Sequence, residues 1–440
     1  MIRAARLLER VATFAFLVMF AGIMWPPDAY LSGAMVTPQG ASNLYDFLEF
    51  AMLVPFLAIG FFACRRELPR LLWWAWPVLA LALFAFLSAY WSDDPWLVVR
   101  RAGTVTLSTL FGIYLVARGD FAWLVAVLVK VFALAAIASF IAIVVLPQAA
   151  TVTGDYYTHA WRGAFTDKND LGMVCGAALI FAVYAYRKRL GPRWLAGFVV
   201  AANLVLLYGS ESKTPLVFMS AALYAALVVL ALRRRSAAGL IVGFALLVFG
   251  LAAAGFLAVG WRDVLLALGR DATFTNRTRI WQLALEYIAK RPWLGYGFGV
   301  FWREQSDMAQ TFWAALGFKT PHAHNGWLEM ALGIGWVGAG IAALGWVSAL
   351  YRTLRVAAAP HAEHVAFCLA LLAAIFVENL SEYEFFRPGR LMWALFVAVL
   401  VYLGREVAIY RASRAEERRT MAVARAQPFI YAPLREAPAE

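Results

Sequence analysis

The sequence predicts an all-α polytopic membrane protein with about twelve transmembrane helices. Of its 440 residues, 63% are hydrophobic and only 15% are charged, whereas an average soluble domain has about 25% charged residues. Apolar windows near the roughly 20 residues that cross the hydrocarbon core of a bilayer recur along the chain. Together these observations exclude a soluble globular protein, a disordered chain and a disulfide scaffold.

Each apolar window is expected to be helical, because lipid cannot hydrogen-bond an exposed backbone. The windows lie near residues 8–25, 45–64, 71–91, 97–117, 121–147, 170–186, 194–210, 214–232, 237–260, 325–350, 364–380 and 390–404. We divide the chain into an N-terminal bundle of about nine spans (1–260), a large outer loop (261–324), C-terminal spans (325–404) and a basic tail (405–440). No internal repeat at a fixed period is visible.

The basic residues of the connections predict the orientation. With the N-terminus inside, the Arg/Lys clusters near residues 3–10, 65–70, 187–193, 233–235, 352–355 and 405–419 all fall on the cytoplasmic side, as the positive-inside rule requires. Both termini are then cytoplasmic. The net charge of +12 thus reports topology, and we expect no nucleic-acid partner.

Residues 261–324 form the only large outer connection, so chemistry outside the membrane is expected there. Within it, Arg279–Lys290 carries apolar residues on a helical period and stops at Arg291-Pro292, which predicts an amphipathic helix in the membrane interface. The Gly-rich stretch Gly295-Tyr-Gly-Phe-Gly299 follows. No strand precedes it, so we interpret it as a sharply bent turn and not as a dinucleotide-binding fingerprint.

Some cations fall on the outer side, where the positive-inside rule does not explain them. They are Arg100, Arg101, Arg162, Lys168, Lys213, Arg262, Arg270, Arg277, Arg279, Lys290, Arg291, Arg303, Lys319 and Arg387. Arginine binds phosphate oxygens with a planar fork, so these residues suggest a phosphate-bearing lipid ligand. The alternative for each is a snorkelling or solvated side chain. For Arg277, just before the amphipathic helix, we favour function.

His322 and His324 lie where the outer loop enters the next span, in Pro321-His-Ala-His-Asn-Gly-Trp-Leu-Glu329. An imidazole there can take a proton from a sugar hydroxyl or stabilise a leaving phosphate. Its alternative is a hydrogen-bonded interfacial residue. The pair could also bind zinc, but no His-Glu-x-x-His or cysteine partner is nearby, so we expect no metal.

Outer carboxylates give further candidates. Glu378 and Glu382, in Glu378-Asn-Leu-Ser-Glu-Tyr-Glu384, end a span, where an ionisable residue usually faces a cavity. Asp93 and Asp94 could bind a divalent ion. We instead interpret Trp91-Ser-Asp-Asp-Pro-Trp96 as a helix end, a turn and an N-cap.

Several motifs of this sequence resemble those of known protein families. His324-Asn325, nine residues and Gly335-Trp-Val-Gly338 resemble the His-Asn, nine residues, Gly-x-x-Gly pattern of bacterial O-antigen ligases. Arg277-Thr-Arg-Ile-Trp281, followed by Arg291-Pro-Trp-Leu-Gly-Tyr-Gly297, is similar to the loop of the O-antigen ligase and polymerase superfamily. The stretches Gly163-Ala-Phe-Thr-Asp-Lys-Asn-Asp-Leu-Gly172 and Ser210-Glu-Ser-Lys-Thr-Pro215 resemble the ExoQ-like exopolysaccharide polymerases. The resemblance spans about residues 90 to 395.

This resemblance implies a GT-C-like membrane glycosyltransferase. Such an enzyme takes a glycan from an undecaprenyl-pyrophosphate donor at the periplasmic face of the bacterial inner membrane, without nucleotide sugar, metal or cofactor. By position, His324 would be the general base and Arg277 would hold the donor pyrophosphate. The substrate-binding candidates are Arg279, Arg100, Arg101, Arg162, Lys168, Asn169, Lys213, Asn325, His322, Glu378 and Glu382. Asn276 replaces a common glycine and Asp167 a common histidine, which leaves open whether Arg277 or Arg279 meets the phosphate.

We expect a polymerase that joins lipid-linked repeat units of an exopolysaccharide or O-antigen. Its partners would be the lipid-linked donor, a glycan acceptor, membrane lipids and a chain-length regulator. One alternative is a ligase that moves O-antigen to lipid A core or, less favoured, to a protein. The alternative from another class is a transporter or flippase, which would place charge at the bilayer midplane; only Lys130 lies deep in a span.

Overall fold

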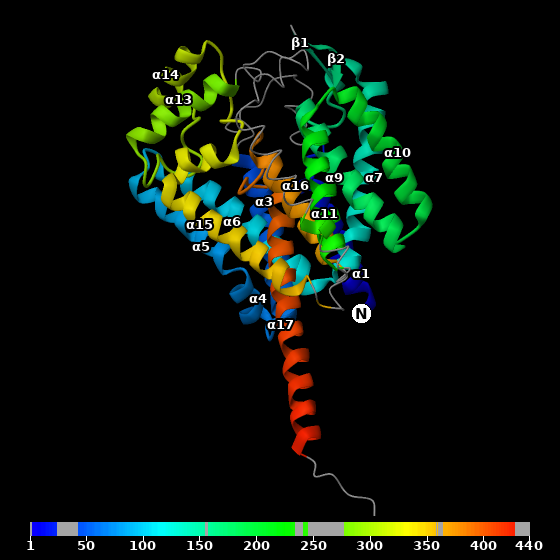
Figure 1. Cartoon of the computed structure of the whole chain (residues 1–440). Helices are drawn as coiled ribbons and strands as arrows, with labels where there is room; N and C mark the ends of the chain where they lie inside the picture. Colours follow the sequence, from blue (N-terminus) through cyan, green and yellow to red (C-terminus); the bar gives the residue numbers. More distant parts are fainter. Residues whose placement is uncertain are drawn as a thin grey trace, which may run out of the picture.

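The computed structural model describes residues 2–23, 43–154, 157–233, 241–244, 277–357, 359 and 364–426. Over these residues the chain is a bundle of helices with one short antiparallel hairpin (Figure 1). The expected helical class is therefore confirmed. Each predicted apolar window that lies within the described residues coincides with a helix, whereas the window at 237–260 lies outside them except for residues 241–244.

The elements follow one another as the sequence patterns predict. They are α1 (Ile2–Phe20), α3 (Asn43–Ala63), α4 (Leu68–Trp74), α5 (Trp76–Leu87), η1 (Ser88–Trp91), α6 (Pro95–Arg118), α7 (Phe121–Val145), α8 (Pro147–Ala150), β1 (Thr151–Gly154), β2 (Tyr157–Trp161), α9 (Lys168–Lys188), α10 (Arg193–Ser210), α11 (Thr214–Arg233), α13 (Arg277–Lys290), α14 (Asp307–Leu316), α15 (Gly326–Val356), α16 (Val365–Asn379) and α17 (Leu391–Ala426). In the hairpin, Thr151 pairs with Trp161.

Six helices of the described residues are long and apolar enough to cross a membrane, namely α7, α9, α10, α11, α15 and α17. The number becomes seven if α4 and the segment after it, bent by 77°, form one span. The chain is thus a multi-pass membrane protein, but the expected twelve spans are not confirmed. Hydropathy counts the window at 364–380 as a span, but the helix there, α16, is only 15 residues long. That is shorter than the roughly 20 residues that cross a bilayer.

The first half of α17 is the centre of the bundle. Its residues from Leu391 to Leu403 are all buried, and it packs against α6, α15 and α16. A helix that is apolar all round must be covered on every side. Beyond Val407 the same helix becomes exposed, from Arg411 on it is also polar, and it projects from the body (Figure 1). The predicted tail therefore begins inside a continuous helix.

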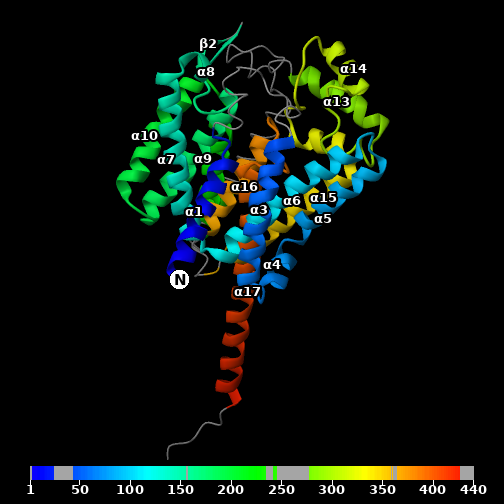
Figure 2. The ribbon, with the colours of Figure 1, turned by 180° about the vertical axis from the view of Figure 1, so that it is seen from behind.

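The two ends of the bundle differ. The N-terminus and the projecting part of α17 lie at one end, whereas α13, α14 and the hairpin lie at the other in both views (Figures 1 and 2). Helix α13 confirms that this segment is an amphipathic helix, because Ile280, Ala284, Tyr287 and Ile288 are buried on one face, whereas its position in the membrane interface stays a prediction. They pack with α14 in a small aromatic core of their own.

A break in α15 joins this end to the bundle. Ile334 and Gly335 leave helical geometry, and the freed backbone groups bond to the Gly-rich stretch. The Tyr296 and Gly297 amides donate to the carbonyls of residues 332 and 333 at 2.9 and 2.8 Å. Gly335 has φ +67°, and a Cβ there would lie 2.1 Å from the Trp293 carbonyl oxygen. Only glycine fits this close approach, and the predicted turn is confirmed.

Candidate active site

The turn before α15 presents His324. The residue has φ +48°, a left-handed conformation that a side chain rarely adopts and that its surroundings must enforce. Asn325 enforces it from one side, because its Oδ1 accepts from the Trp327 and Leu328 amides and its Nδ2 donates to the Leu380 carbonyl at 3.1 Å. The His324 amide donates to Nδ1 of His322 at 3.1 Å.

Glu329 stabilises the same turn through two hydrogen bonds. Its carboxylate accepts from the Ala323 amide and from the Trp302 indole, both at 2.9 Å. A charged acceptor on a backbone N–H makes a strong hydrogen bond. The backbone around His324 is therefore fixed by Asn325 and Glu329.

Glu382 joins His324 to Arg277. Its Oε2 lies 3.1 Å from Nδ1 of His324, and its Oε1 lies 2.5 Å from a guanidinium nitrogen of Arg277. Arg277 also donates to the Ser381 carbonyl. The three side chains come from α13, the turn before α15 and the loop after α16. We call His322, His324, Glu382 and Arg277 the histidine cluster.

Charge and burial in the cluster favour a proton acceptor at His324. Burial acts to raise the pKa of Glu382, but the hydrogen bond from His324 and the charge of Arg277 outweigh it, so the pKa lies below its ordinary value. A carboxylate that accepts Nδ1–H leaves Nε2 as the free acceptor. The His324 side chain is 24% exposed against 7% for Glu382, so the imidazole is the accessible member.

His322 is neutral beside it. Desolvation, to which the positive charges of Arg387, Arg277 and Arg390 add, holds the pKa of His322 well below its ordinary value. A neutral ring can accept the His324 amide, as observed. His322 thus supports the turn.

Further charges surround the cluster. Arg387 pairs with Glu384 at 2.7 Å, and Arg390 pairs with Asp170 near the start of α9 at 3.3 Å. The N-cap of α9, Asp167, lies within electrostatic range of His324 and Glu382. Helix α9 therefore borders the cluster with its first turn, which carries the candidates Lys168 and Asn169.

The remaining candidates take other positions. Arg279 donates to the Ala315 carbonyl at the end of α14. Arg162 donates to the carbonyls of Ala149 and Thr166 beside the hairpin, and Asn169 accepts from the Ser212 hydroxyl at 3.2 Å. Lys213 is exposed in the turn between α10 and α11. Glu378 is 1% exposed, and its Oε1 has no hydrogen-bond partner among the described residues.

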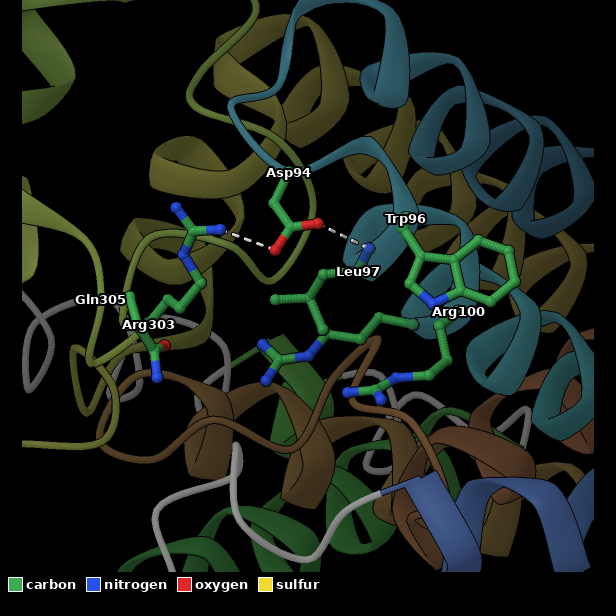
Figure 3. Close-up of a pocket in the computed structure, with 7 residues that line it drawn as sticks. Asp94, Trp96, Leu97, Arg100, Arg303 and Gln305 are labelled. Atoms are coloured by element: carbon green, nitrogen blue, oxygen red, sulfur yellow. Dashed lines mark hydrogen bonds and ion pairs between the residues drawn. The ribbon is translucent and has the colours of Figure 1, made fainter.

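Arg100 and Arg101 lie in a pocket at the start of α6 (Figure 3). The pocket has a volume of about 200 Å³ and is lined by Asp94, Trp96, Leu97, Arg100, Arg101, Arg303 and Gln305. Asp94 is the N-cap of α6 and accepts from the Leu97 amide at 3.1 Å, which confirms the predicted cap. We call this the arginine pocket.

Within the described residues, one group of side chains has the geometry of a metal site. Ligand atoms of His322, His324 and Glu382 lie within 4.8 Å of one another. Two imidazoles and a carboxylate form a set that zinc uses. Glu382 supplies the third ligand that the sequence did not place near the histidines, but its other oxygen is bound to Arg277.

Sequence reasoning missed some of the neighbouring residues. The sequence indicates Arg387 and Arg303 only as outer charges, and it does not single out Asp170, Arg390 or Glu329. The high density of charged residues between Glu382 and Arg390 is a signal in the sequence that could have identified Arg387 as part of the site. The sequence gives no such signal for Glu329, because its role depends on the turn before α15 folding back onto its carboxylate.

Comparisons with known proteins agree with these motifs. Residues 198–343 match the family model described as O-antigen ligase; this stretch contains Arg277 and His324 but not Glu382. The exopolysaccharide production protein ExoQ of Rhizobium meliloti (strain 1021) is 29% identical over 211 residues. The alignment covers 45% of this chain and 48% of ExoQ, about half the length of each.

Proposed function

We propose that this chain is a member of the O-antigen ligase and polymerase superfamily, which the match of residues 198–343 and the similarity to ExoQ support, and that it is a glycosyltransferase that polymerises lipid-linked oligosaccharide repeat units. The units are carried on undecaprenyl pyrophosphate and become an exopolysaccharide or O-antigen. The observation that carries the proposal is the chain of contacts from His324 through Glu382 to Arg277.

In this proposal His324 is the general base. Glu382 fixes the Nδ1–H tautomer, and Nε2 accepts the proton of the acceptor hydroxyl as its oxygen attacks the anomeric carbon of the donor. General base catalysis of this kind contributes about 10²- to 10⁴-fold. Asn325 and His322 act as positioning residues, since their hydrogen bonds fix the turn.

Arg277 supports departure of the leaving group. The bond from the anomeric carbon to the diphosphate breaks, and undecaprenyl diphosphate leaves with the electron pair and gains negative charge. Fixed cations near that position stabilise it. Arg277 is favoured over Arg279, because Arg277 contacts the cluster whereas Arg279 is bound to the end of α14. Lys168 and Asn169, with Arg162 and Lys213 behind them, would bind more distant parts of the donor.

The placement in the membrane belongs to the same proposal. The histidine cluster would face the periplasm of a bacterial inner membrane, and both termini would lie in the cytoplasm. The positive-inside pattern supports this, as does the separation of the N-terminus from α13 and α14 (Figure 1). No metal takes part in the proposed step, because Arg277 supplies the positive charge beside Glu382.

The transporter alternative has little support. A transported charge requires ionisable residues that face an internal path. Lys130, the charged residue deep in α7, is exposed on the surface of the bundle among the described residues. The enzyme proposal therefore accounts for more of the charges than a transport path does.

A reconstitution tests the proposal. The purified chain is placed in liposomes with lipid-linked repeat unit as the sole glycan substrate, and products are separated by size. Wild type and His159→Ala, whose exposed imidazole lies on the hairpin, should produce a ladder, and His324→Ala should not. Transfer only after addition of lipid A core would identify a ligase. No glycan transfer under either condition would refute the enzyme reading.

A further inference from the structure

The histidine cluster contains a set of metal ligands that the proposed mechanism does not use as such. The ligand atoms of His322, His324 and Glu382 lie within 4.8 Å of one another, and no other group of the described residues has this spacing. Two imidazoles and one carboxylate form a set that zinc uses in proteins, and three protein ligands are enough to hold it. A metal ion at this end of the bundle would therefore bind at the general base itself.

The hydrogen bond between His324 and Glu382 has nearly the length of one edge of a zinc site. Nδ1 of His324 lies 3.1 Å from Oε2 of Glu382. Zinc binds imidazole nitrogen and carboxylate oxygen at about 2.0–2.2 Å, so two of its tetrahedral ligands are roughly 3.4 Å apart. An ion can therefore replace the shared proton once these two atoms separate by a few tenths of an ångström. His322 becomes the third ligand by a movement of its ring on the order of 1 Å.

The surroundings orient these ligands in advance. Glu329 accepts from the Ala323 amide at 2.9 Å and thereby holds the turn that carries both histidines. On the other side of the cluster, Arg277 donates to Oε1 of Glu382. A carboxylate that binds a metal is commonly hydrogen-bonded by an outer partner that orients it. Arg277 has this position at Oε1, which leaves Oε2 as the oxygen that can bind the ion.

The ligands are also accessible from outside. A metal site needs a path by which the ion enters. The His324 side chain is 24% exposed, and the centroids of the His322 and His324 rings lie 4.1 Å apart. An ion that reaches the exposed imidazole therefore meets the second histidine and the carboxylate close by.

We propose that zinc binds to His322, His324 and Glu382 and thereby inhibits glycan transfer; the inhibition rests on the proposed function, whereas the binding does not. With Nδ1–H donated to Glu382, the lone pair of His324 is on Nε2. When Nδ1 binds zinc, its proton leaves to solvent and Nε2 takes a proton from solvent, so the ring stays neutral and the number of bound protons is unchanged. Nε2 is then a donor. It no longer accepts the proton of the acceptor hydroxyl.

The chemistry of the ligands also determines which ions inhibit. Imidazole nitrogen suits zinc and other transition metals, whereas Mg²⁺ and Ca²⁺ prefer a full set of oxygen ligands. Two of the three ligands here are imidazoles. Zinc is therefore expected to act at concentrations at which Mg²⁺ has no effect.

The first test measures metal binding without any turnover. The full chain, purified without an oligohistidine tag and treated with EDTA, is titrated in nanodiscs of zwitterionic lipid with Co²⁺, whose visible absorption reports four-coordinate binding. Wild type should bind one equivalent that zinc displaces, and Glu382→Gln and His322→Gln should each weaken binding about tenfold or more. The control Cys64→Ser removes a free thiol outside the cluster and should bind like wild type. No binding by wild type, or equal weakening by Cys64→Ser, would refute the site.

Thermal unfolding shows whether a variant has lost the site or the fold. Zinc should raise the Tm of wild type, because a ligand that binds only the folded chain stabilises it. The Tm of Glu382→Gln should not respond to zinc. If folded Glu382→Gln gained as much from zinc as wild type, the assignment of the ligands would be wrong.

A rate measurement tests the inhibition. In the glycan assay, zinc should lower the transfer rate of wild type about 10²-fold or more, as loss of a general base predicts. EDTA should restore the rate, and Mg²⁺ at the same concentration should leave it unchanged. Zinc is kept above the protein concentration and well below that of the lipid-linked substrate, since zinc can also bind the substrate diphosphate. Inhibition only when zinc exceeds the substrate, or a rate that rises with zinc, would overturn the proposal.

Binding and rate together separate the two proposals. If metal-free wild type transfers no glycan yet binds one zinc ion, the proposed function fails and the zinc site stands. If wild type transfers glycan but binds no zinc, the function stands and the zinc site fails. Bound zinc that leaves the transfer rate unchanged would refute the inhibition.

Discussion

The histidine cluster and the arginine pocket use arginine in different ways. In the cluster, Arg277 is paired with Glu382 at 2.5 Å, and the same carboxylate holds His324. In the pocket, Arg303 pairs with Asp94 at 2.6 Å and Arg101 donates to the Gly299 carbonyl. A paired arginine in a buried network is fixed in place and can orient its neighbours.

The difference also separates the expected functions. A reacting group must be held within a fraction of an ångström, so its partners must be part of the protein. The arginines of the pocket instead join α6 to the chain that leaves the Gly-rich stretch. We therefore expect changes in the cluster to lower kcat and changes in the pocket to lower stability.

Both regions depend on the same support. The loop from Pro292 to Gly297 is hydrogen-bonded into the break of α15. The chain that leaves it provides Gly299, which accepts from Arg101, and Arg303, which pairs with Asp94. The break in α15, at Ile334 and Gly335, lies ten and eleven residues after His324, which is in the turn before this helix. One glycine thus sets the position of both regions.

The largest expected effect comes from Gly335→Ala. The residue has φ +67°, and its new Cβ would lie 2.1 Å from a carbonyl oxygen, so the loop must detach from α15. Left-handed strain alone costs about 1–3 kcal/mol. We expect loss of activity, together with a lower Tm in nanodiscs.

Gly340→Ala is the matched control in the same helix. A Cβ at Gly340 meets no atom within 4 Å, and alanine in a helix is favoured over glycine by up to about 1 kcal/mol. The Tm should stay equal or rise, and activity should persist. If Gly335→Ala behaved like Gly340→Ala, the common support would be refuted.

The second largest effect is expected from Glu382→Gln. The side chain keeps its size but loses its charge, so Arg277 loses its ion pair and His324 its tautomer control. We expect kcat to fall about 10²- to 10⁴-fold. Glu304→Gln, an exposed carboxylate 3.5 Å from Lys319, is the control. An unchanged kcat would remove Glu382 from the mechanism.

The sequence predicts much of this architecture, since hydropathy and helical period act over short distances. It correctly predicts helix α13, the Gly-rich turn and the N-cap at Asp94. It does not settle the number of spans. The window at 97–117 is counted as a span, but α6 is not among the six candidate spans of the structure. A polar face at Thr104 and Ser108 lowers the mean hydropathy of α6, although these hydroxyls bond within the helix.

The site is predicted residue by residue but not as a cluster. His324, Arg277 and Glu382 were each candidates, yet Glu382 is 58 residues from His324 and 105 from Arg277 along the chain. Only the packing of the loop after α16 brings them together. Asn325 likewise appears in the sequence as a substrate-binding candidate, whereas its amide caps α15 and contacts Leu380.

A smaller effect, on stability and not on kcat, is expected from Asp94→Asn. Asparagine retains the N-cap of α6 but loses the ion pair with Arg303, whose two side chains are 28% and 23% exposed. A pair of this exposure contributes about 0.2–1 kcal/mol, so we expect the Tm to fall slightly at low salt, and the difference to shrink above about 0.15 M salt. Asp93→Asn, at the exposed neighbouring aspartate, should leave the Tm unchanged. A fall in kcat with an unchanged Tm would show that the pocket takes part in transfer.

The smallest expected effect is that of a chelator on the histidine cluster. His322, His324 and Glu382 have the spacing of a metal site, so incubation with EDTA tests the cluster directly. Since Arg277 already supplies the positive charge beside Glu382, we expect the transfer rate to stay within about twofold, the scatter of such an assay. A large loss that zinc restores would assign these residues to a metal. His324 would then be a ligand of that metal and could not act as the general base.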